Sequence, residues 1–237
     1  MSVLLNKNGV SVAGTGVGVL HIESRFPLVH GHLQNARSLG VPLIYECVEG
    51  VSPRQIVACD PAVEAPLIAA ARRLVGRGAK AVIGTCGSFI NYHTALVQAV
   101  DVPVFSSILA AVPLLLRTVR QDARVAIVFA SVASFTARVR DQAGIDDASR
   151  IAATDCASLP AFQPIMENSR SLDSDALMAQ VREHLGAFIA EEPAVAVIVL
   201  QCSELAPYAD AIRQDCGLPV FDINSLALWV DTSLFGS

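Results

Sequence analysis

The feature of this 237-residue sequence that most limits its fold is a regular alternation of short apolar segments with longer helical ones. The short segments are rich in Val, Ile and Leu and predict strands at residues 16–22, 41–48, 81–86, 102–107, 124–130, 151–156, 197–202 and 218–222. Apolar residues at helical spacing predict helices at residues 62–75, 109–119, 173–190 and 223–235. Alternating strands and helices pack as parallel sheets covered by helices, so we expect an α/β fold.

Composition and a pattern that occurs twice in the sequence refine this expectation. Hydrophobic residues make up 53% of the chain and aromatic residues only 5%, which suits an interior of helices and parallel strands. The segments that end at Cys86 and Cys202 each follow a helix and a surface turn and precede another helix. We therefore expect two pseudo-symmetric lobes, each a parallel sheet flanked by helices, with the active site in the cleft between them. Residues 1–107 and 217–237 are expected to form the first lobe, which carries Cys86, and residues 108–216 the second, which carries Cys202.

Charge and cysteine usage exclude several classes of function. The net charge of -5 gives no basic surface for nucleic acid or an anionic membrane, so a small molecule is the expected partner. Residues 1–8 lack the layout of a secretory signal, and no apolar run approaches the roughly 20 residues of a membrane span, so we expect a cytoplasmic protein.

The six cysteines form no C-x-x-C pair, so neither disulfides nor a zinc site is expected. Gly14, Gly16 and Gly18 precede or lie inside a strand, which does not match a dinucleotide-binding turn.

Two thiols at strand ends are the strongest candidates for chemistry. Residues 81–89 (AVIGTCGSF) and 197–205 (VIVLQCSEL) each place a cysteine between an apolar strand and a helix. A single buried cysteine is more often a packing residue than a catalytic one, but two in matching contexts weaken that interpretation. A helix N-terminus favours the thiolate, so we expect the pKa of both thiols to be lowered toward neutrality. A thiol and a thiolate facing each other could remove a carbon-bound proton from one face and return one to the other.

The loop after the first strand is a second candidate region. Ligands in open α/β folds bind beyond the carboxyl ends of strands, which is where Ser24 and Arg25 lie. The Arg25 guanidinium could pair with a substrate carboxylate or form a surface ion pair with Glu23, and its position favours neither. Asp222 is expected to cap the last helix.

Several of these segments together resemble a known family. GTCGSF at residues 84–89 and LQCSELAPY at residues 200–208 are similar to the two cysteine motifs of the aspartate/glutamate/hydantoin racemase superfamily. GVLHIESRFP at residues 18–27 and GLPVFD at residues 217–222 extend the resemblance over nearly the whole chain.

The resemblance implies a mechanism and a set of site residues. Members of this superfamily have two pseudo-symmetric α/β lobes, pair into dimers or larger assemblies, and use neither pyridoxal phosphate nor a metal. By resemblance, Cys86 and Cys202 are the paired acid and base on opposite faces of the α-carbon. The substrate-binding residues implied by position are Ser24, Arg25, Gly87, Ser88, Phe89, Ser134, Phe135, Thr136, Ser203 and Glu204.

Residues after the two cysteines bear on the substrate. Gly87-Ser88 replaces the Asn-Thr of glutamate and aspartate racemases, whereas Ser203-Glu204 is closer to the Thr-Glu of aspartate racemases than to the Thr-His of glutamate racemases. The resemblance thus predicts a racemase of an amino acid or related chiral carboxylate, aspartate- or glutamate-like. A hydantoin racemase and a maleate isomerase-like enzyme remain alternatives, because both keep two cysteines. Decarboxylases of malonate derivatives match less well, since they typically keep one. A non-catalytic protein that binds a small carboxylate is the alternative of another class.

Overall fold

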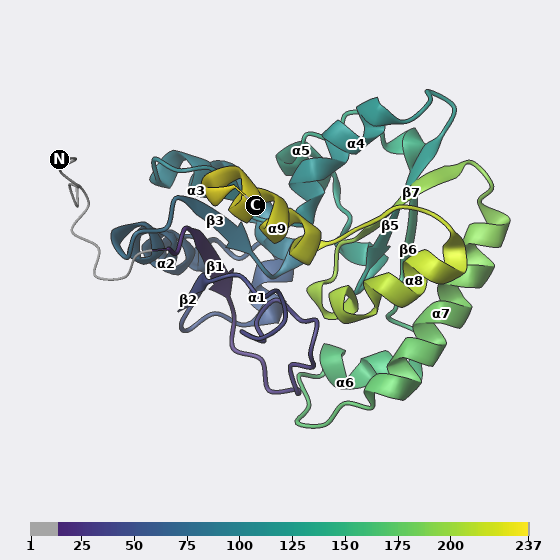
Figure 1. The fold of residues 1–237 in the computed structure, drawn as a ribbon, viewed down its shortest axis with the longest axis horizontal. Coiled ribbons are helices and arrows are strands. Elements are labelled where there is room, and N and C mark those ends of the chain that lie inside the picture. The colour runs from purple at the N-terminus through teal and green to yellow at the C-terminus, as the bar shows by residue number, and fades with distance from the viewer. Residues whose placement is uncertain (1–13, 237) are drawn as a thin grey trace.

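The computed structural model describes residues 14–236, so residues 1–8, named above for the absence of a signal layout, lie outside the described part. Two four-stranded parallel sheets form the framework, and they lie side by side in Figure 1. The first sheet has the order β2-β1-β3-β4, and the second repeats it as β6-β5-β7-β8. The strands are β1 Val17–His21, β2 Leu43–Cys47, β3 Ala81–Gly84, β4 Val104–Phe105, β5 Arg124–Phe129, β6 Ile151–Asp155, β7 Val195–Leu200 and β8 Val220–Phe221.

Helices connect the strands and cover the sheets. The α-helices are α1 Pro53–Val57, α2 Glu64–Gly76, α3 His93–Ala99, α4 Val112–Thr118, α5 Ala137–Ala143, α6 Gln163–Met166, α7 Ser174–Glu191, α8 Ala209–Cys216 and α9 Ile223–Phe235. The 3-10 helices are η1 Pro61–Val63, η2 Gly87–Tyr92, η3 Ile108–Ala111, η4 Val132–Ser134, η5 Ala148–Arg150, η6 Pro160–Phe162 and η7 Ser203–Tyr208.

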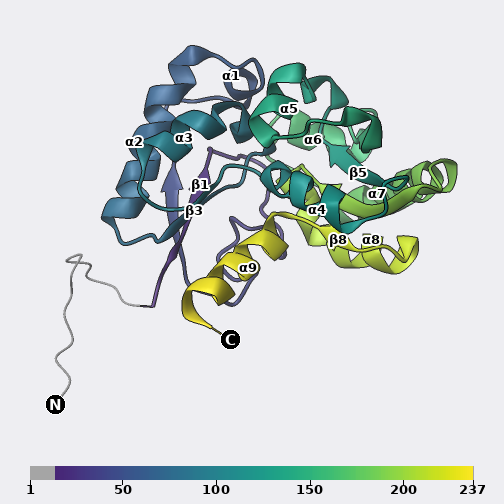
Figure 2. The same cartoon turned by 90° about the horizontal axis from the view of Figure 1, so that it is seen from above.

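Apolar periodicity explains the first lobe. All four residues of β3 are buried, as expected for a central strand covered on both faces. Helix α2 turns one stripe inward, made of Leu67, Ala70, Ala71 and Leu74. Helix α9 lies on the opposite side of β1 and β3 from α2 and α3 (Figure 2). The first sheet is thereby enclosed between helices.

The second lobe is built in the same way. Asp173 caps α7 by accepting a hydrogen bond from the Ala176 N–H at 2.9 Å. Leu177, Val181 and Leu185 then recur every four residues on the buried face of α7. The expected α/β fold with two similar lobes is confirmed by the matching strand orders.

The lobe boundary differs from expectation at the C-terminal end. Strand β8 was expected in the first lobe, but it pairs with β7 in the second sheet, with Val199 opposite Phe221. This edge strand occupies the position that β4 holds in the first sheet. The chain crosses back at Asp222, which caps α9 as expected and accepts a hydrogen bond from the Ser225 N–H at 2.7 Å. Within residues 14–236, no helix has both the length and the apolar character needed to cross a membrane.

Candidate active site

Cys86 and Cys202 have nearly the same backbone setting. Cys86 follows β3 and is the N-cap of η2, with φ -82° and ψ 117°. Cys202 follows β7 and is the N-cap of η7, with φ -79° and ψ 119°. Each 3-10 helix leads directly into an α-helix, α3 or α8. The pattern repeated in the sequence is therefore also repeated in the structure, and it places one thiol at the end of a strand in each sheet.

A glycine lets the two cysteine turns approach each other. A Cβ atom added to Gly87 would lie 2.1 Å from Gln201 Nε2 and 2.5 Å from the Gln201 carbonyl oxygen. Gly87 follows the first cysteine, and Gln201 precedes the second. The contact between them places both cysteines at the same junction of the two lobes, where any side chain at Gly87 would separate the turns.

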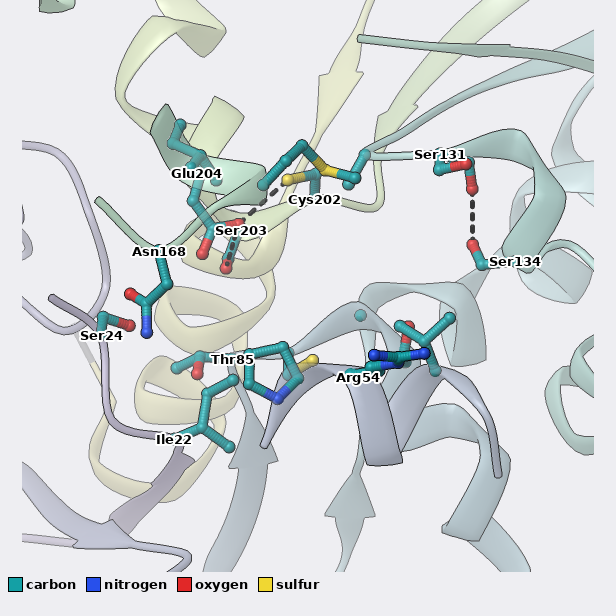
Figure 3. Close-up of a pocket in the computed structure, with 18 of the residues that line it drawn as sticks. Ile22, Ser24, Arg54, Thr85, Ser131, Ser134, Asn168, Cys202, Ser203 and Glu204 are labelled. Atoms are coloured by element: carbon teal, nitrogen blue, oxygen red, sulfur yellow. Dashed lines mark hydrogen bonds between the residues drawn. The ribbon is translucent and has the colours of Figure 1, made fainter. Parts of the chain in front are cut away.

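The cysteines line one cavity of about 590 Å³ (Figure 3). This volume lies within the range of sites for small ligands. The cavity receives residues from both lobes, including Ile22 and Phe26 from the first and Ile165 and Met166 from the second. Its hydroxyl-bearing lining residues are Ser24, Thr85, Ser88, Ser131, Ser134 and Ser203, and its charged ones are Glu23, Arg54 and Glu204.

Most of the residues expected in the site lie on this cavity, but four do not. Cys86, Cys202, Ser24, Gly87, Ser88, Ser134, Ser203 and Glu204 line it. Phe89 is fully buried in the first-lobe core. Phe135 packs on Phe129 with ring centroids 5.1 Å apart. Thr136 caps α5 by accepting from the Val139 N–H at 3.3 Å.

Arg25 contacts the second lobe through its backbone. Its side chain is not part of the cavity lining, and among the described residues it forms no ion pair with Glu23. Its backbone N–H instead donates to Asn168 Oδ1 at 2.7 Å, which joins the first lobe to the segment after α6.

The cavity also contains polar residues that the sequence did not single out. Arg54 is the cationic side chain of the lining, and it reaches the cavity from α1. A capping box formed by Ser52 and Gln55 starts that helix. This box is readable from the sequence, but nothing in it indicates that α1 turns toward the cysteines. Asn168 and Gln34 likewise line the cavity from segments outside the two cysteine motifs, and Thr85 lines it from within the first motif.

Cys202 is hydrogen-bonded to a carboxylate. Its Sγ donates to Glu204 Oε2 at 3.0 Å, and Ser203 Oγ donates to the same oxygen at 3.1 Å (dashed in Figure 3). His32 Nε2 lies 3.8 Å from the other oxygen, Oε1. Burial raises the pKa of Glu204, but the contacts with His32 and Cys202 outweigh burial and lower this pKa below its ordinary value. Glu204 is therefore a carboxylate at neutral pH.

The expectation of lowered thiol pKa values is wrong for this structure. Burial raises the pKa of Cys86 to about 12, although hydrogen bonds from the backbone of Ser88 and Phe89 favour the thiolate. Burial, and then the neighbouring Glu204 carboxylate, raise the pKa of Cys202 well above its ordinary value. The helix N-termini are present as expected, but desolvation of the charged form outweighs them. Both groups are thiols at neutral pH.

The site thus combines two neutral thiols, one carboxylate hydrogen-bonded to one of them, and one arginine, in a largely apolar cavity. Thiols of this kind can exchange protons with a carbon acid held between them. Within residues 14–236, no three His, Cys, Asp or Glu side chains are grouped as metal ligands.

Comparisons with known proteins agree with this architecture. The Asp/Glu/Hydantoin racemase family matches residues 51–230. Dimethylsulfoniopropionate lyase 7 of Emiliania huxleyi is 26% identical over 235 residues, covering 93% of this chain and 69% of the lyase. A dimethylsulfoniopropionate lyase of Durusdinium sp. clade D is 24% identical over 219 residues, covering 90% of this chain and 72% of that protein. The chain spans 61% of the length of two further lyases from Emiliania huxleyi.

Solved structures share the fold at lower identity. An allantoin racemase from Klebsiella pneumoniae superposes with a TM-score of 0.63 at 19% identity, covering 92% of this chain and 87% of that one. Unliganded arylmalonate decarboxylase superposes with a TM-score of 0.60 at 19% identity, covering 94% and 93%. The family match extends over most of the chain and includes both cysteines. This protein therefore belongs to the Asp/Glu/hydantoin racemase family.

Proposed function

We propose that this protein is a cofactor-independent racemase of a small chiral carboxylate, such as an amino acid, in which Cys86 and Cys202 exchange protons with the α-carbon. The observation that carries the proposal is that two thiols from equivalent strand ends line a single cavity. Inversion of a carbon centre requires a base on one face and an acid on the other, and two groups from opposite lobes can supply both.

In the proposed reaction, one cysteine reacts as a thiolate. It takes the α proton, and the electron pair of the C–H bond remains on the substrate. The other cysteine then gives its S–H proton to the opposite face. For the mirror-image substrate the two cysteines exchange roles.

Arg54 is the proposed partner of the substrate carboxylate. Arg54 lines the cavity, and its guanidinium can form a bidentate, charge-assisted pair with a carboxylate bound there. Neutralising that carboxylate also stabilises the negative charge that develops when the α proton leaves. The hydroxyl groups of the lining can donate further hydrogen bonds to the same substrate group.

Proton exchange in heavy water tests this proposal. The protein is incubated with aspartate, glutamate, other amino acids and 5-substituted hydantoins, and deuterium at the α-carbon and optical rotation are followed together. Racemisation of one substrate, with solvent deuterium in the product, is the expected result. Binding of a carboxylate without any exchange would favour a non-catalytic binding protein.

A second candidate is a lyase that uses the same proton removal. The relatives from Emiliania huxleyi and Durusdinium are named dimethylsulfoniopropionate lyases, and they align with about nine tenths of this chain. Loss of an α proton followed by loss of a β substituent requires one base, which either cysteine can provide. Dimethylsulfoniopropionate therefore belongs in the same screen. Its cleavage to acrylate and dimethyl sulfide, without racemisation of any other compound, would favour the lyase.

A further inference from the structure

His32 is a buried histidine whose free ring nitrogen faces the Glu204 carboxylate. The residue is 2% exposed and lies in the turn-rich loop after β1. Its Nδ1 accepts a hydrogen bond from the Gln34 N–H at 3.1 Å. Since Nδ1 is an acceptor, the ring proton lies on Nε2. In the described part of the chain, Nε2 has no hydrogen-bond partner, and Glu204 Oε1 lies 3.8 Å from it.

The backbone around His32 brings the ring to Glu204. Gly31 has φ +95°, and a Cβ atom there would lie 2.8 Å from the Cα of Pro207 in η7, the helix that carries Glu204. The Gly31 carbonyl also accepts a hydrogen bond from Asn224 Nδ2 at 2.6 Å. The loop of the first lobe is thereby packed against a helix of the second, and the ring position does not depend on the ring's own contacts.

The two Glu204 oxygens serve different neighbours. Oε2 accepts from Cys202 Sγ and Ser203 Oγ, while Oε1 faces the N–H of His32. The two hydrogen bonds to Oε2 and the His32 N–H 3.8 Å from Oε1 favour the ionised carboxylate, and an ionised acceptor keeps the proton on Cys202. Cys86 differs, because among the described residues no carboxylate accepts its proton and only backbone groups bond to it. Glu204 and Cys156 are the titratable groups that raise the pKa of Cys202. His32 and Cys202 lower the pKa of Glu204, and Glu204 in turn raises the pKa of Cys86.

We propose that His32 is a positioning residue that, through Glu204, keeps the proton on Cys202 in the resting enzyme and leaves Cys86 as the thiol that forms the thiolate. The catalytic consequence rests on the proposed function. For one enantiomer the Cys86 thiolate takes the α proton, Cys202 gives its proton to the opposite face, and Glu204 stays a carboxylate throughout; the mirror-image substrate reacts with the form left by this turnover, in which Cys86 is protonated and Cys202 is the thiolate. Water then returns a proton to Cys202 and accepts one from Cys86.

Thiol alkylation tests the proposal without any substrate. The intact protein is treated with iodoacetamide near neutral pH, and labelling of Cys86, Cys156 and Cys202 is followed separately by peptide mass spectrometry. In His32→Leu burial is no longer offset by His32, so the pKa of Glu204 rises and a larger share of Glu204 takes a proton from water; the neutral carboxyl no longer raises the pKa of Cys202. We expect the ratio of Cys202 to Cys86 labelling rates to rise about tenfold. In His32→Gln, which keeps an N–H donor, the ratio should stay near the wild-type value.

Two further variants sharpen the test. His184 bonds to Thr154 Oγ1 at 2.8 Å from helix α7 and is not part of the cavity lining, so His184→Leu should leave the ratio unchanged. Glu204→Gln should raise Cys202 labelling, and adding His32→Leu to it should have no further effect, because His32 acts through Glu204.

Three results would overturn the proposal. These are an unchanged ratio in His32→Leu, an equal rise in His32→Gln, or a parallel rise at the buried Cys156, which would report general opening of the fold. Because no substrate is present, these outcomes are separate from a failure of the heavy-water screen. If the heavy-water screen fails, the proposed racemase function is wrong, but the inference that His32 and Glu204 keep the proton on Cys202 is unaffected.

Discussion

The thiol of Cys86 lies deep in the protein, yet the residue keeps partial exposure to the cavity. Burial disfavours the thiolate because the charged sulfur loses hydration that the surrounding apolar side chains cannot replace. The two backbone hydrogen bonds at the start of η2 offset only part of this loss. A substrate therefore meets a site in which the reactive form of the cysteine is a minor species at neutral pH.

Activity should consequently rise with pH. With the Cys86 pKa at about 12, the thiolate fraction increases tenfold for each pH unit below that value. We expect the logarithm of kcat/KM to increase with a slope near 1 between about pH 7 and about pH 10. A plateau beginning near neutrality would contradict this expectation, since it would mean that the thiolate is already formed there.

Arg54 and Arg25 form a matched pair for a test of carboxylate binding. Arg54 lines the cavity, whereas Arg25 is exposed beside it and contributes only its backbone N–H to Asn168. Arg54→Gln should lower kcat/KM about 10- to 100-fold, mainly through KM, because a charge-assisted hydrogen bond is lost. Arg25→Gln should change it less than about threefold. A larger loss of kcat/KM in Arg25→Gln than in Arg54→Gln would instead place the carboxylate-binding site in the loop after β1.

At the scale of elements, the site depends on how closely the β3–η2 turn meets the β7–η7 turn. The Gln201 side chain could move away from an added methyl group at Gly87, but its carbonyl oxygen, 2.5 Å from that position, belongs to the backbone. A side chain at Gly87 must therefore move one turn relative to the other. The two cysteines follow these turns, so their spacing is coupled to this contact.

Gly87→Ala should reduce both stability and activity. Overpacking is expected to lower the free energy of unfolding by about 1–3 kcal/mol, and displacement of Cys86 to lower kcat/KM about 100-fold. Urea unfolding and the exchange assay measure the two effects. Gly186→Ala is the control, because Gly186 lies within α7 and an added Cβ there meets no atom within 4 Å. That change should be neutral or stabilising by up to about 1 kcal/mol. A wild-type free energy of unfolding and a wild-type kcat/KM in Gly87→Ala would contradict this expectation, because the two turns would then accommodate a methyl group without moving.

Over the whole molecule, contacts beyond the cavity also hold the two lobes together. Arg138 in α5 of the second lobe donates to the Asn91 carbonyl at 3.0 Å. Gln142 in the same helix accepts from the Thr94 N–H at 3.0 Å. These bonds connect α5 to η2 and α3, the helices that follow Cys86. The position of one thiol thus depends on packing across the lobe interface.

Stability should fall at alkaline pH. The pKa values of Cys86 and Cys156 are raised to about 12 in the folded protein, chiefly by burial. Between the ordinary thiol pKa and about 12, the unfolded chain releases protons that the folded chain keeps, so rising pH favours unfolding. Each such thiol should contribute up to about 1.4 kcal/mol per pH unit in this range. Urea unfolding from about pH 8 to about pH 11 measures how the free energy of unfolding changes with pH. Cys156→Ala should reduce this slope. A free energy of unfolding that does not change over this range would contradict the burial of these thiols.

The sequence predicted the framework better than the electrostatics. Apolar runs and helical spacing were sufficient for the strands and for helices such as α7 and α9, because both signals are local. The repeated cysteine unit indicated two lobes, but β8 was assigned to the wrong one, since a two-residue edge strand carries no signal of its partner. Arg54 and His32 were missed as site residues because their proximity to the cysteines arises only from tertiary packing. The direction of the thiol pKa shifts was wrong for the same reason: the sequence shows a helix start but not the burial around it.

The central claim is that both cysteines are needed to invert one carbon centre. Racemisation by the wild-type protein, Cys86→Ala and Cys202→Ala should be measured from each enantiomer of the same substrate in heavy water. We expect each variant to lose racemisation by at least about 100-fold, while deuterium exchange without inversion survives from the enantiomer whose α proton faces the remaining cysteine. Full racemisation by either single variant would contradict the two-base account.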